Sequence, residues 1–580
     1  SDSGDDIGDN DDVNASIGYY RNSTKYIIDK PDIISVSGSD GTVYRKRGCT
    51  YDSNGNLSIL RQFINNGDIA ETTIDYYSNG NIMSVTSPEN HKGQRYRVAY
   101  NYDSTTQSRI TSITDSFGYK SRLMYDNNSI YYGKPSETLD INNRSTKYTY
   151  DKFGRIVAVK GPYDQTGDPT ISIEYNNYTK PAFAYVKNKG YIDEENTQSD
   201  PIRVCSFADG LRRIIQTKTD GEVDNSSRII TSGRTNFDVM GRISEQYDPF
   251  VEPAGNFSYN SNSDSSYRTR FYYDIFGRQT RIVYPDSTEV NNTYNIAAYS
   301  NGNDNGRLFK INTRDQENKQ KNMLRDTRGN IRCVEEFGEL LTIRTRYEYN
   351  PLNEITKVID DDGNETRINY DNLGRRTSIN NPDTGPVSYS HDSAGNITRK
   401  VTANLSAQGK AINYIYNYNR LQMIDYPDMN DVILTYGASN AGNQLGRIAT
   451  IDNGIVSEER YYGLLGELKK SIKKINVAYP SPEVKSYETN YTFDTMGRMR
   501  SITFNDLERI VYEYNRGGLV KSVYSSNNHY YYVKNIEYNV YGQRSKVQYG
   551  NDVVSKFNYN NMRRLEGINT SRGDIVYQNL

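Results

Sequence analysis

One seven-residue pattern recurs from end to end of this 580-residue chain. It reads aromatic, aspartate, two variable residues, glycine, a polar residue and usually an aliphatic one. Clear copies start at Tyr51, Tyr150, Phe237, Tyr273, Tyr370, His391 and Phe493, and worn copies start at Tyr349 and Tyr538. Repetition on this scale constrains the architecture more than any other feature, because each copy must take the same local fold. We therefore expect one supersecondary unit, repeated along the chain.

The unit that the pattern predicts is a β-hairpin. The residues before the aspartate alternate as in Lys147-Tyr148-Thr149-Tyr150, and aromatic and β-branched side chains suit a pleated strand. The aspartate can cap a turn by accepting backbone N–H groups, and the glycine supplies the positive φ of a type I turn followed by a bulge. Asn353 replaces the glycine in one copy, which fits because asparagine tolerates that conformation next best. We predict an all-β fold with little helix.

We interpret the repeat residues as structural rather than catalytic. The turn residues that carry this prediction are Tyr51, Asp52, Gly55, Tyr150, Asp151, Gly154, Arg155, Phe237, Asp238, Gly241, Arg242, Tyr273, Asp274, Gly277, Arg278, Tyr370, Asp371, Gly374, Arg375, Asp392, Gly395, Phe493, Asp494, Gly497 and Arg498. We expect the arginine after each glycine to lie on a solvated rim, because acidic residues balance it. His391 takes the tyrosine position of its repeat and should be a strand residue.

The composition predicts a thin wall rather than a solid core. The chain has 54 tyrosines and no tryptophan, and its hydrophobic fraction is only 35%. A tyrosine buries a large ring and still tolerates water at its hydroxyl. This side chain therefore suits a sheet that is wetted on both faces.

Other classes of function lack a signal in the sequence. The formal net charge is −2, so nothing indicates a nucleic-acid partner, which would need a basic stripe. Cys49, Cys205 and Cys333 are too far apart for a metal motif or a disulfide framework and are expected to be small buried hydrophobes. No apolar run approaches the roughly 18 residues of a membrane span. We predict no catalytic residue, no cofactor and no metal site, and no pair of carboxylates stands out as a glycosidase pair.

The chain divides into a short lead-in and one long repeat section. Residues 1–16 are acidic and free of aromatic residues, and are expected to be disordered. Residues 17–580 are expected to be continuous hairpin sheet, with irregular insertions near 176–204 and 251–266. Because repeats stack on their neighbours, we expect one body rather than several domains. We also expect this chain to be a section of a longer protein.

The repeated Tyr-Asp-x-x-Gly-Arg unit closely resembles YD/Rhs-repeat proteins, over residues from about 40 to 580. Stretches such as Asn90–Tyr96, Ile113–Tyr119 and Ala208–Arg213 resemble the subgroup of SpvB-like proteins and the B components of insecticidal Tc toxin complexes. Asn404–Lys410 and Gly463–Glu467 are similar to the same subgroup.

The resemblance implies a β-hairpin strip that spirals into a large hollow shell. Such shells enclose a toxic C-terminal polypeptide until delivery, and that cargo is not in this chain. The family's autoprotease segment is also absent, so the resemblance assigns no catalytic residue here. The implied partners are the cargo, the rest of the shell and other toxin-complex subunits. The implied setting is a bacterial protein assembled in the cytoplasm, then exported or injected, and so secreted or at the cell surface.

A second interpretation stays open at this point. YD-repeat proteins of cell walls and the animal teneurins use the same kind of barrel for adhesion, binding proteins or carbohydrates. Exposed tyrosines would stack on sugars readily, but no residue of this sequence supports a carbohydrate site. A glycan-processing enzyme is a more distant alternative.

Overall fold

The structure is a computed structural model of the 580-residue chain. It describes residues 13–65, 67–126, 133–189, 201–261, 267–301, 304–478, 480–573 and 575–579. Within these ranges the strands form one sheet of 18 strands and one of 29 strands.

The first sheet contains eighteen of the described strands. They are β1 (Val13–Asn22), β2 (Ile27–Gly38), β3 (Val43–Tyr51), β4 (Leu57–Phe63), β5 (Ile69–Tyr76), β6 (Ile82–Glu89), β7 (Arg95–Tyr102), β8 (Ile110–Asp115), β9 (Lys120–Met124), β10 (Glu137–Leu139), β11 (Ser145–Tyr150), β12 (Ile156–Lys160), β13 (Ile171–Asn176), β14 (Ala182–Asn188), β15 (Ile202–Ala208), β16 (Ile214–Val223), β17 (Ser226–Ser232) and β20 (Phe250–Pro253).

The second sheet contains the other strands that the structure describes. They are β18 (Thr235–Phe237), β19 (Ile243–Tyr247), β21 (Arg268–Tyr273), β22 (Gln279–Val283), β23 (Glu289–Asn301), β24 (Asp304–Arg314), β25 (Gln320–Arg325), β26 (Ile331–Phe337), β27 (Thr342–Tyr349), β28 (Ile355–Ile359), β29 (Glu365–Tyr370), β30 (Arg376–Asn381), β31 (Gly385–His391), β32 (Ile397–Val401), β33 (Ile412–Asn417), β34 (Arg420–Asp425), β35 (Val432–Tyr436), β36 (Ile448–Asp452), β37 (Val456–Tyr462), β38 (Leu468–Val477), β39 (Glu483–Phe493), β40 (Met499–Thr503), β41 (Arg509–Tyr514), β42 (Val520–Ser525), β43 (Tyr530–Tyr538), β44 (Arg544–Tyr549), β45 (Val554–Tyr559), β46 (Leu565–Arg572) and β47 (Ile575–Asn579).

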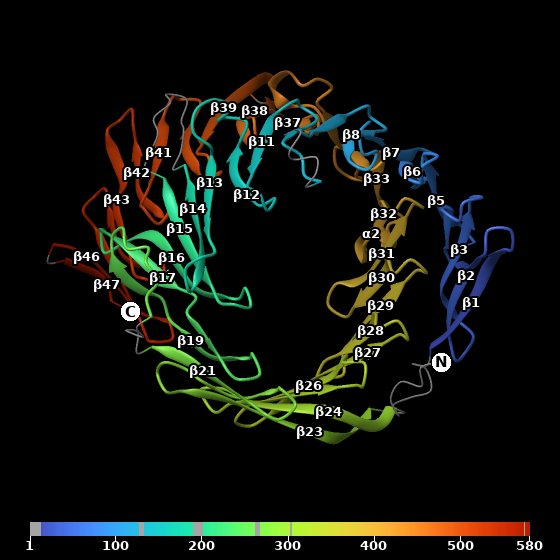
Figure 1. The fold of residues 1–580 in the computed structure, drawn as a ribbon, viewed down its shortest axis with the longest axis horizontal. Helices are drawn as coiled ribbons and strands as arrows, with labels where there is room; N and C mark the ends of the chain where they lie inside the picture. The colour runs from blue at the N-terminus through green and yellow to red at the C-terminus, as the bar shows by residue number, and fades with distance from the viewer. Residues whose placement is uncertain are drawn as a thin grey trace. The chain divides into compact units, whose positions relative to one another are not determined.

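Strands that follow one another in the chain pair antiparallel, so the sheets are built from hairpins. The ladders from β1 to β2 and from β45 to β46 are typical. Figure 1 shows β27 to β32 side by side in chain order. One exchange interrupts the order, because β20 pairs with β17 of the first sheet whereas β18 and β19 pair with each other and begin the second.

Helix is nearly absent from the described residues. It is limited to α2 (Ala403–Ala407) and the 3₁₀ turn η1 (Ala441–Asn443). The predicted all-β fold with little helix is therefore confirmed. None of the described helices has the length and hydrophobicity needed to cross a bilayer.

The predicted irregular segments are only partly irregular. Residues 1–12 of the predicted lead-in lie outside the described residues, but residues 13–16 belong to β1, so the disordered prediction is wrong for these four. The predicted insertion at 176–204 contains the regular strand β14, and that at 251–266 begins inside β20. Both predictions are wrong for residues 182–188 and 250–253, which pair with neighbouring strands, whereas residues 190–200 and 262–266 of these insertions lie outside the described residues.

Each repeat closes its hairpin with the predicted bulge. In the copy at Tyr150, the N–H of Gly154 donates to the Asp151 carbonyl at 2.9 Å, and the ladder shifts register between Thr149 and Tyr150. The glycines Gly55, Gly154, Gly241, Gly277, Gly374, Gly395 and Gly497 have φ between +72° and +96°. Asn353 takes the same conformation at +63°, as predicted, and His391 ends strand β31.

Few side chains are fully buried, as expected for a thin wall. All residues of β12, β33 and β34 are half-buried, which places neither face in a dry core. The buried hydrophobic residues among those described are Ala70, Cys205, Phe207, Ile229, Tyr247, Tyr299, Leu308, Leu324, Cys333, Tyr538 and Val547. Cys205 and Cys333 are buried free thiols as predicted, whereas Cys49 is only half-buried.

Where a repeat begins with tyrosine, its hydroxyl fastens the hairpin to an earlier one. The hydroxyl of Tyr514 donates at 2.7 Å to the carbonyl of Met499, which begins the return strand of the preceding repeat. The same bond joins Tyr51 to Pro31, Tyr76 to Leu57, Tyr102 to Ile82, Tyr150 to Pro135, Tyr273 to Ile243, Tyr349 to Ile331, Tyr370 to Ile355, Tyr462 to Ile448, Tyr538 to Val520 and Tyr559 to Arg544. We call these bonds the tyrosine latches.

The described residues cluster into two compact units. The first unit is Ser1–Ser121, Asn291–Thr435 and Thr450–Ile455, and the second is Arg122–Val290, Tyr436–Ala449 and Val456–Leu580. Each unit therefore combines a stretch of the first sheet with a stretch of the second. The prediction of one continuous body over residues 17–580 stays a prediction.

The tyrosine latches predict that the protein unfolds in alkali. Burial raises the pKa of Tyr51 to about 12, and burial also raises the pKa of Tyr150 and Tyr514. A tyrosine whose pKa is higher in the folded than in the unfolded protein stabilises the fold at every pH below its unfolded pKa of about 10. This stabilisation is lost as the pH rises toward the pKa of the folded protein. We expect far-UV circular dichroism to lose its β signal between pH about 10 and 12, together with the rise in phenolate absorbance. Complete tyrosine ionisation with an unchanged β signal would show that the tyrosine latches do not stabilise the fold.

Candidate functional site: the repeat turns and the contacts between the sheets

The repeat aspartate organises its own turn. In the copy at Tyr150, Asp151 Oδ1 accepts the N–H groups of Phe153 and Arg155 at 2.9 Å each, and Oδ2 accepts Arg155 Nε at 2.7 Å. The bond from the arginine Nε recurs at Asp209, Asp238, Asp274, Asp371 and Asp494, at 2.6–2.8 Å. In the turns of Asp52 and Asp392 an asparagine replaces the arginine, and its Nδ2 donates to the aspartate Oδ2 at 2.9 Å in both turns. The backbone N–H and then the guanidinium of Arg213 hold the pKa of Asp209 below its ordinary value.

The repeat arginine reaches from its own turn to the next hairpin. The guanidinium of Arg213 lies 3.6 Å from the ring centroid of Phe237, and that of Arg242 lies 4.5 Å from the centroid of Tyr273. Arg155 stacks on Tyr175, and Arg498 on Tyr514, in the same way. Each of these contacts combines an ion pair within one turn with a cation–π contact to its neighbour.

The arginines also hydrogen-bond to the next turn. Arg213 Nη1 donates to the Gly241 carbonyl, and Arg242 Nη1 donates to the Asp274 carbonyl, both at 3.3 Å. Arg375 Nη1 donates to the Asp392 carbonyl at 2.6 Å. The expected solvated rim is therefore wrong, because these guanidiniums are partly covered and join successive turns. The partner of each arginine lies in the next repeat, and the sequence of one repeat cannot reveal it.

In the first unit, turn and strand residues of the second sheet contact loop and strand residues of the first sheet. The partners are 301 to 330 residues apart in the chain. They are Arg45 with Glu354 and the Asp371 carbonyl, Asn90 with the Tyr418 carbonyl, His91 with Asp392, Lys92 with Gln422, Gln94 with Asn417, and Asp115 with Arg420. Beside these polar contacts, the Tyr418 ring lies 5.1 Å from that of Phe117 and 6.2 Å from that of Tyr96, so the two sheets also meet here through aromatic side chains.

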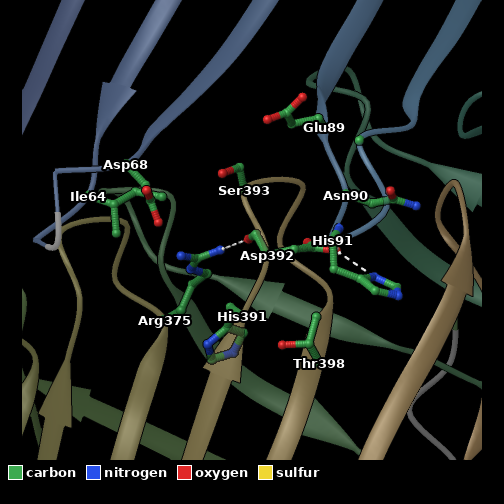
Figure 2. Close-up of a pocket in the computed structure, with 11 residues that line it drawn as sticks. Ile64, Asp68, Glu89, Asn90, His91, Arg375, His391, Asp392, Ser393 and Thr398 are labelled. Atoms are coloured by element: carbon green, nitrogen blue, oxygen red, sulfur yellow. Dashed lines mark hydrogen bonds and ion pairs between the residues drawn. The ribbon is translucent and has the colours of Figure 1, made fainter.

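A pocket of about 360 Å³ lies among these contacts in the first unit (Figure 2). The backbone N–H of His91 donates to Asp392 Oδ2 at 3.1 Å, and His91 Nδ1 lies 3.6 Å from the same oxygen. His391 also lines the pocket, and burial and then the nearby Arg375 lower its pKa. Asp392 bonds within its own turn and to His91. The contact between Asp392 and His91 therefore joins two turns and does not activate a nucleophile. Within the described ranges no group of three or more His, Cys, Asp or Glu residues is placed to hold a metal ion.

The second unit repeats this arrangement with other residues. The partners here are 293 to 315 residues apart. They are Asn142 with Leu445, Arg144 with Asn443, Tyr163 with Glu467 and Leu464, Lys189 with Thr495, Pro201 and Asp220 with Arg516, Glu222 with Lys521, Asn225 with Glu537, and Asp248 with Tyr541. Several of these residues lie in repeat turns, such as Thr495 and Tyr541, but the repeat does not show which distant residue each one meets, so the sequence did not identify the pairs.

Asp220 is the most buried carboxylate of this set. Its side chain is only 4% exposed, and it accepts Arg203 Nε and Nη2 at 2.9 Å each. Arg516 of the second sheet donates to the same carboxylate at 3.2 Å. One buried anion thus holds two cations that come from different sheets.

The turn contacts predict a graded effect of substituting Arg242. Arg242→Ala removes the ion pair to Asp238 and the contacts to Tyr273 and Asp274, and should lower the free energy of unfolding by about 1–2 kcal/mol. Arg242→Lys should recover only part of this loss, because an ammonium group cannot bond to Asp238 and to the Asp274 carbonyl while it stacks on Tyr273, as the planar guanidinium does. Urea denaturation measures both variants. Lys319→Ala, which removes an exposed pair with Glu317, is the control and should change stability by less than about 0.5 kcal/mol. Equal effects of Arg242→Ala and Lys319→Ala would contradict this role of Arg242.

The buried Asp220 network predicts a larger effect in the second unit. Asp220→Asn leaves Arg203 and Arg516 without their anion and should cost about 3 kcal/mol. Hydrogen exchange should rise at the turn of Arg516 as well as at the strands next to Asp220. The matched control is Asp552→Asn, which breaks an exposed pair with Lys534 and should leave both readouts unchanged. A loss confined to the first sheet would show that Asp220 does not hold the second.

Comparison with known proteins finds likeness only at the level of structure. No family model and no curated protein matches the chain. A crystal structure of TcdB2-TccC3 matches at 15% identity and a TM-score of 0.80, covering 98% of this chain and 36% of that one. The same complex without its hypervariable C-terminal region matches at 14% identity and a TM-score of 0.80, covering 98% and 37%. A mutant Tc holotoxin pore of Photorhabdus luminescens gives the same values.

The chain spans less than two fifths of the length of these matched chains. The likeness nevertheless extends over almost all of the present chain. Its fold is therefore the fold of the matched part of the Tc toxin complexes.

Proposed function

We propose that this chain is a non-enzymatic wall section of a bacterial toxin shell of the Tc type. The shell encloses a toxic polypeptide and shields it until delivery. The proposal extends to the YD/Rhs-repeat class and its SpvB-like subgroup, on the strength of the repeated Tyr-Asp-x-x-Gly-Arg turns. The observation that carries it is the structural likeness to TcdB2-TccC3 over 98% of this chain.

The construction of the sheets supports an enclosing role. A compact domain buries its strands against a second layer, whereas here whole strands such as β33 and β34 stay half-buried. Stability instead comes from contacts between neighbouring hairpins, so the sheet can extend without a growing core. A wall of tyrosines and balanced charges offers an unfolded chain many weak contacts and no strong site.

The partners and the setting follow from the same proposal. The cargo is a toxic polypeptide that is not part of this chain, and the rest of the shell and other toxin-complex subunits complete the assembly. The protein is assembled in the bacterial cytoplasm and then exported or injected, so it acts as a secreted or surface protein. It requires no cofactor and no nucleic acid.

Protease protection tests the proposal against the adhesion alternative. A polypeptide without a stable fold, joined after residue 580, should be digested at least about tenfold more slowly than the same polypeptide on a compact carrier. Asp220→Asn, which weakens a contact between the sheets of the second unit, should speed digestion, and Asp552→Asn should not. Digestion at the carrier rate, together with binding to cell surfaces or glycans, would favour an adhesion module and contradict the enclosing role.

A further inference from the structure

The most buried lysine of the described residues lies against a carboxylate in the second unit. The side chain of Lys218 in β16 is 0% exposed, and that of Glu252 in β20 is 7% exposed. Lys218 Nζ donates to Glu252 Oε2 and, at 3.4 Å, to the backbone carbonyl of Asn256. Taking an amine and a carboxylate out of water costs free energy, and such a pair is often no more stabilising than apolar residues of the same size. The burial of this pair therefore points to a role beyond stability.

Two asparagine amides occupy the remaining positions around Glu252. Asn256 Nδ2 donates at 3.2 Å to Oε2, which is the oxygen that Lys218 also holds. Asn260 Nδ2 donates to the other oxygen, Oε1, at 2.5 Å. One carboxylate oxygen thus joins an amine and a primary amide, so Lys218 Nζ lies beside the side chain of Asn256.

The side-chain amide of Asn256 is bonded at both of its ends. Its Nδ2 is held by Glu252, and its Oδ1 accepts the backbone N–H of Ser258 at 3.2 Å. A backbone N–H in this position stabilises negative charge that develops on the oxygen when the carbonyl carbon is attacked. The segment is fixed over the first sheet, because the ring of Tyr259 lies 5.4 Å from that of Phe207.

We propose that Lys218 and Asn256 form an isopeptide bond within the chain, with Glu252 as the proton carrier. Glu252 takes a proton from the Lys218 ammonium group, and the resulting amine attacks Asn256 Cγ. The Nζ–Cγ bond forms and the Cγ–Nδ2 bond breaks. Glu252 carries two protons in turn from Nζ to Nδ2, and this nitrogen leaves as an ammonium ion. The reaction consumes no oxidant and no second substrate, and the fold supplies the proximity of the two groups.

The bond joins β16 to the segment that follows β20, between residues 38 apart in the chain. The same segment leads from the first sheet to β21 of the second. A covalent link at this place holds the crossover between the sheets and limits how far the unfolded chain can open. The inference does not depend on the enclosing role, since it concerns only the chemistry of three side chains.

The mass of the intact chain tests the reaction directly. The purified, folded protein should weigh one ammonia less than its sequence. A tryptic digest should contain residues 214–228, uncut after Lys218, joined to residues 243–268. Glu252→Gln keeps the shape of the side chain but cannot carry the protons, so it should keep the full mass. An unaltered chain that is folded and has the full mass of its sequence would overturn the proposal.

Substitution of the two asparagines identifies the acceptor. Asn256→Ala should prevent the loss of ammonia, whereas Asn260→Ala should allow it. Asn256→Asp should lose water in place of ammonia and reach the same final mass as the unaltered chain, so the test holds even where Glu252→Gln does not fold. The control Lys357→Met removes a partly buried lysine that pairs with Glu348, and should leave the loss of ammonia unchanged. A loss that persists in Asn256→Ala and stops in Asn260→Ala would overturn the assignment of Asn256.

Discussion

Many hairpins of this protein are held to the next by side chains of their own turns. The aspartate caps the turn and orients the arginine, and the guanidinium then stacks on an aromatic ring of the following hairpin, as in Asp238, Arg242 and Tyr273. The tyrosine hydroxyl is bonded in the other direction, to a carbonyl of an earlier hairpin. Because these contacts join only neighbours, stability accumulates along the sheet as it does in other repeat proteins. A deep core is unnecessary, and few apolar side chains of the described residues are buried.

A second set of contacts protects the edges of the strip. In each unit, turns of the second sheet lie on loops of the first, with partners roughly 300 residues apart. The near-constant separation means that one strip meets another in a fixed register. The contacts are side-chain hydrogen bonds and ion pairs, with Asp220 as the most buried carboxylate, and in the first unit also ring contacts between Phe117 and Tyr418. Such contacts cover the ends of hairpins that would otherwise be open to other chains.

The sequence predicted local structure well and long-range contacts poorly. The hairpins, the capping role of Asp151, the positive φ of Asn353 and the strand position of His391 all follow from one repeat and its immediate neighbours. The prediction that arginines such as Arg242 lie on a solvated rim was wrong, because their partners belong to the next repeat. The tyrosine latches were not predicted because their acceptors are backbone carbonyls, which carry no sequence signal. Contacts such as Asn142 with Leu445 join residues 303 apart, and neither stretch of sequence identifies its partner.

Small-angle X-ray scattering of the purified chain tests most directly whether these hairpins build a wall around a space. A compact protein of 580 residues would have a radius of gyration of about 25 Å. The account predicts a clearly larger value, and a pair-distance distribution whose maximum lies beyond half the largest dimension, as in a hollow body. A radius near 25 Å with a symmetric distribution would mean a solid domain, and would contradict both the thin wall and the enclosing role.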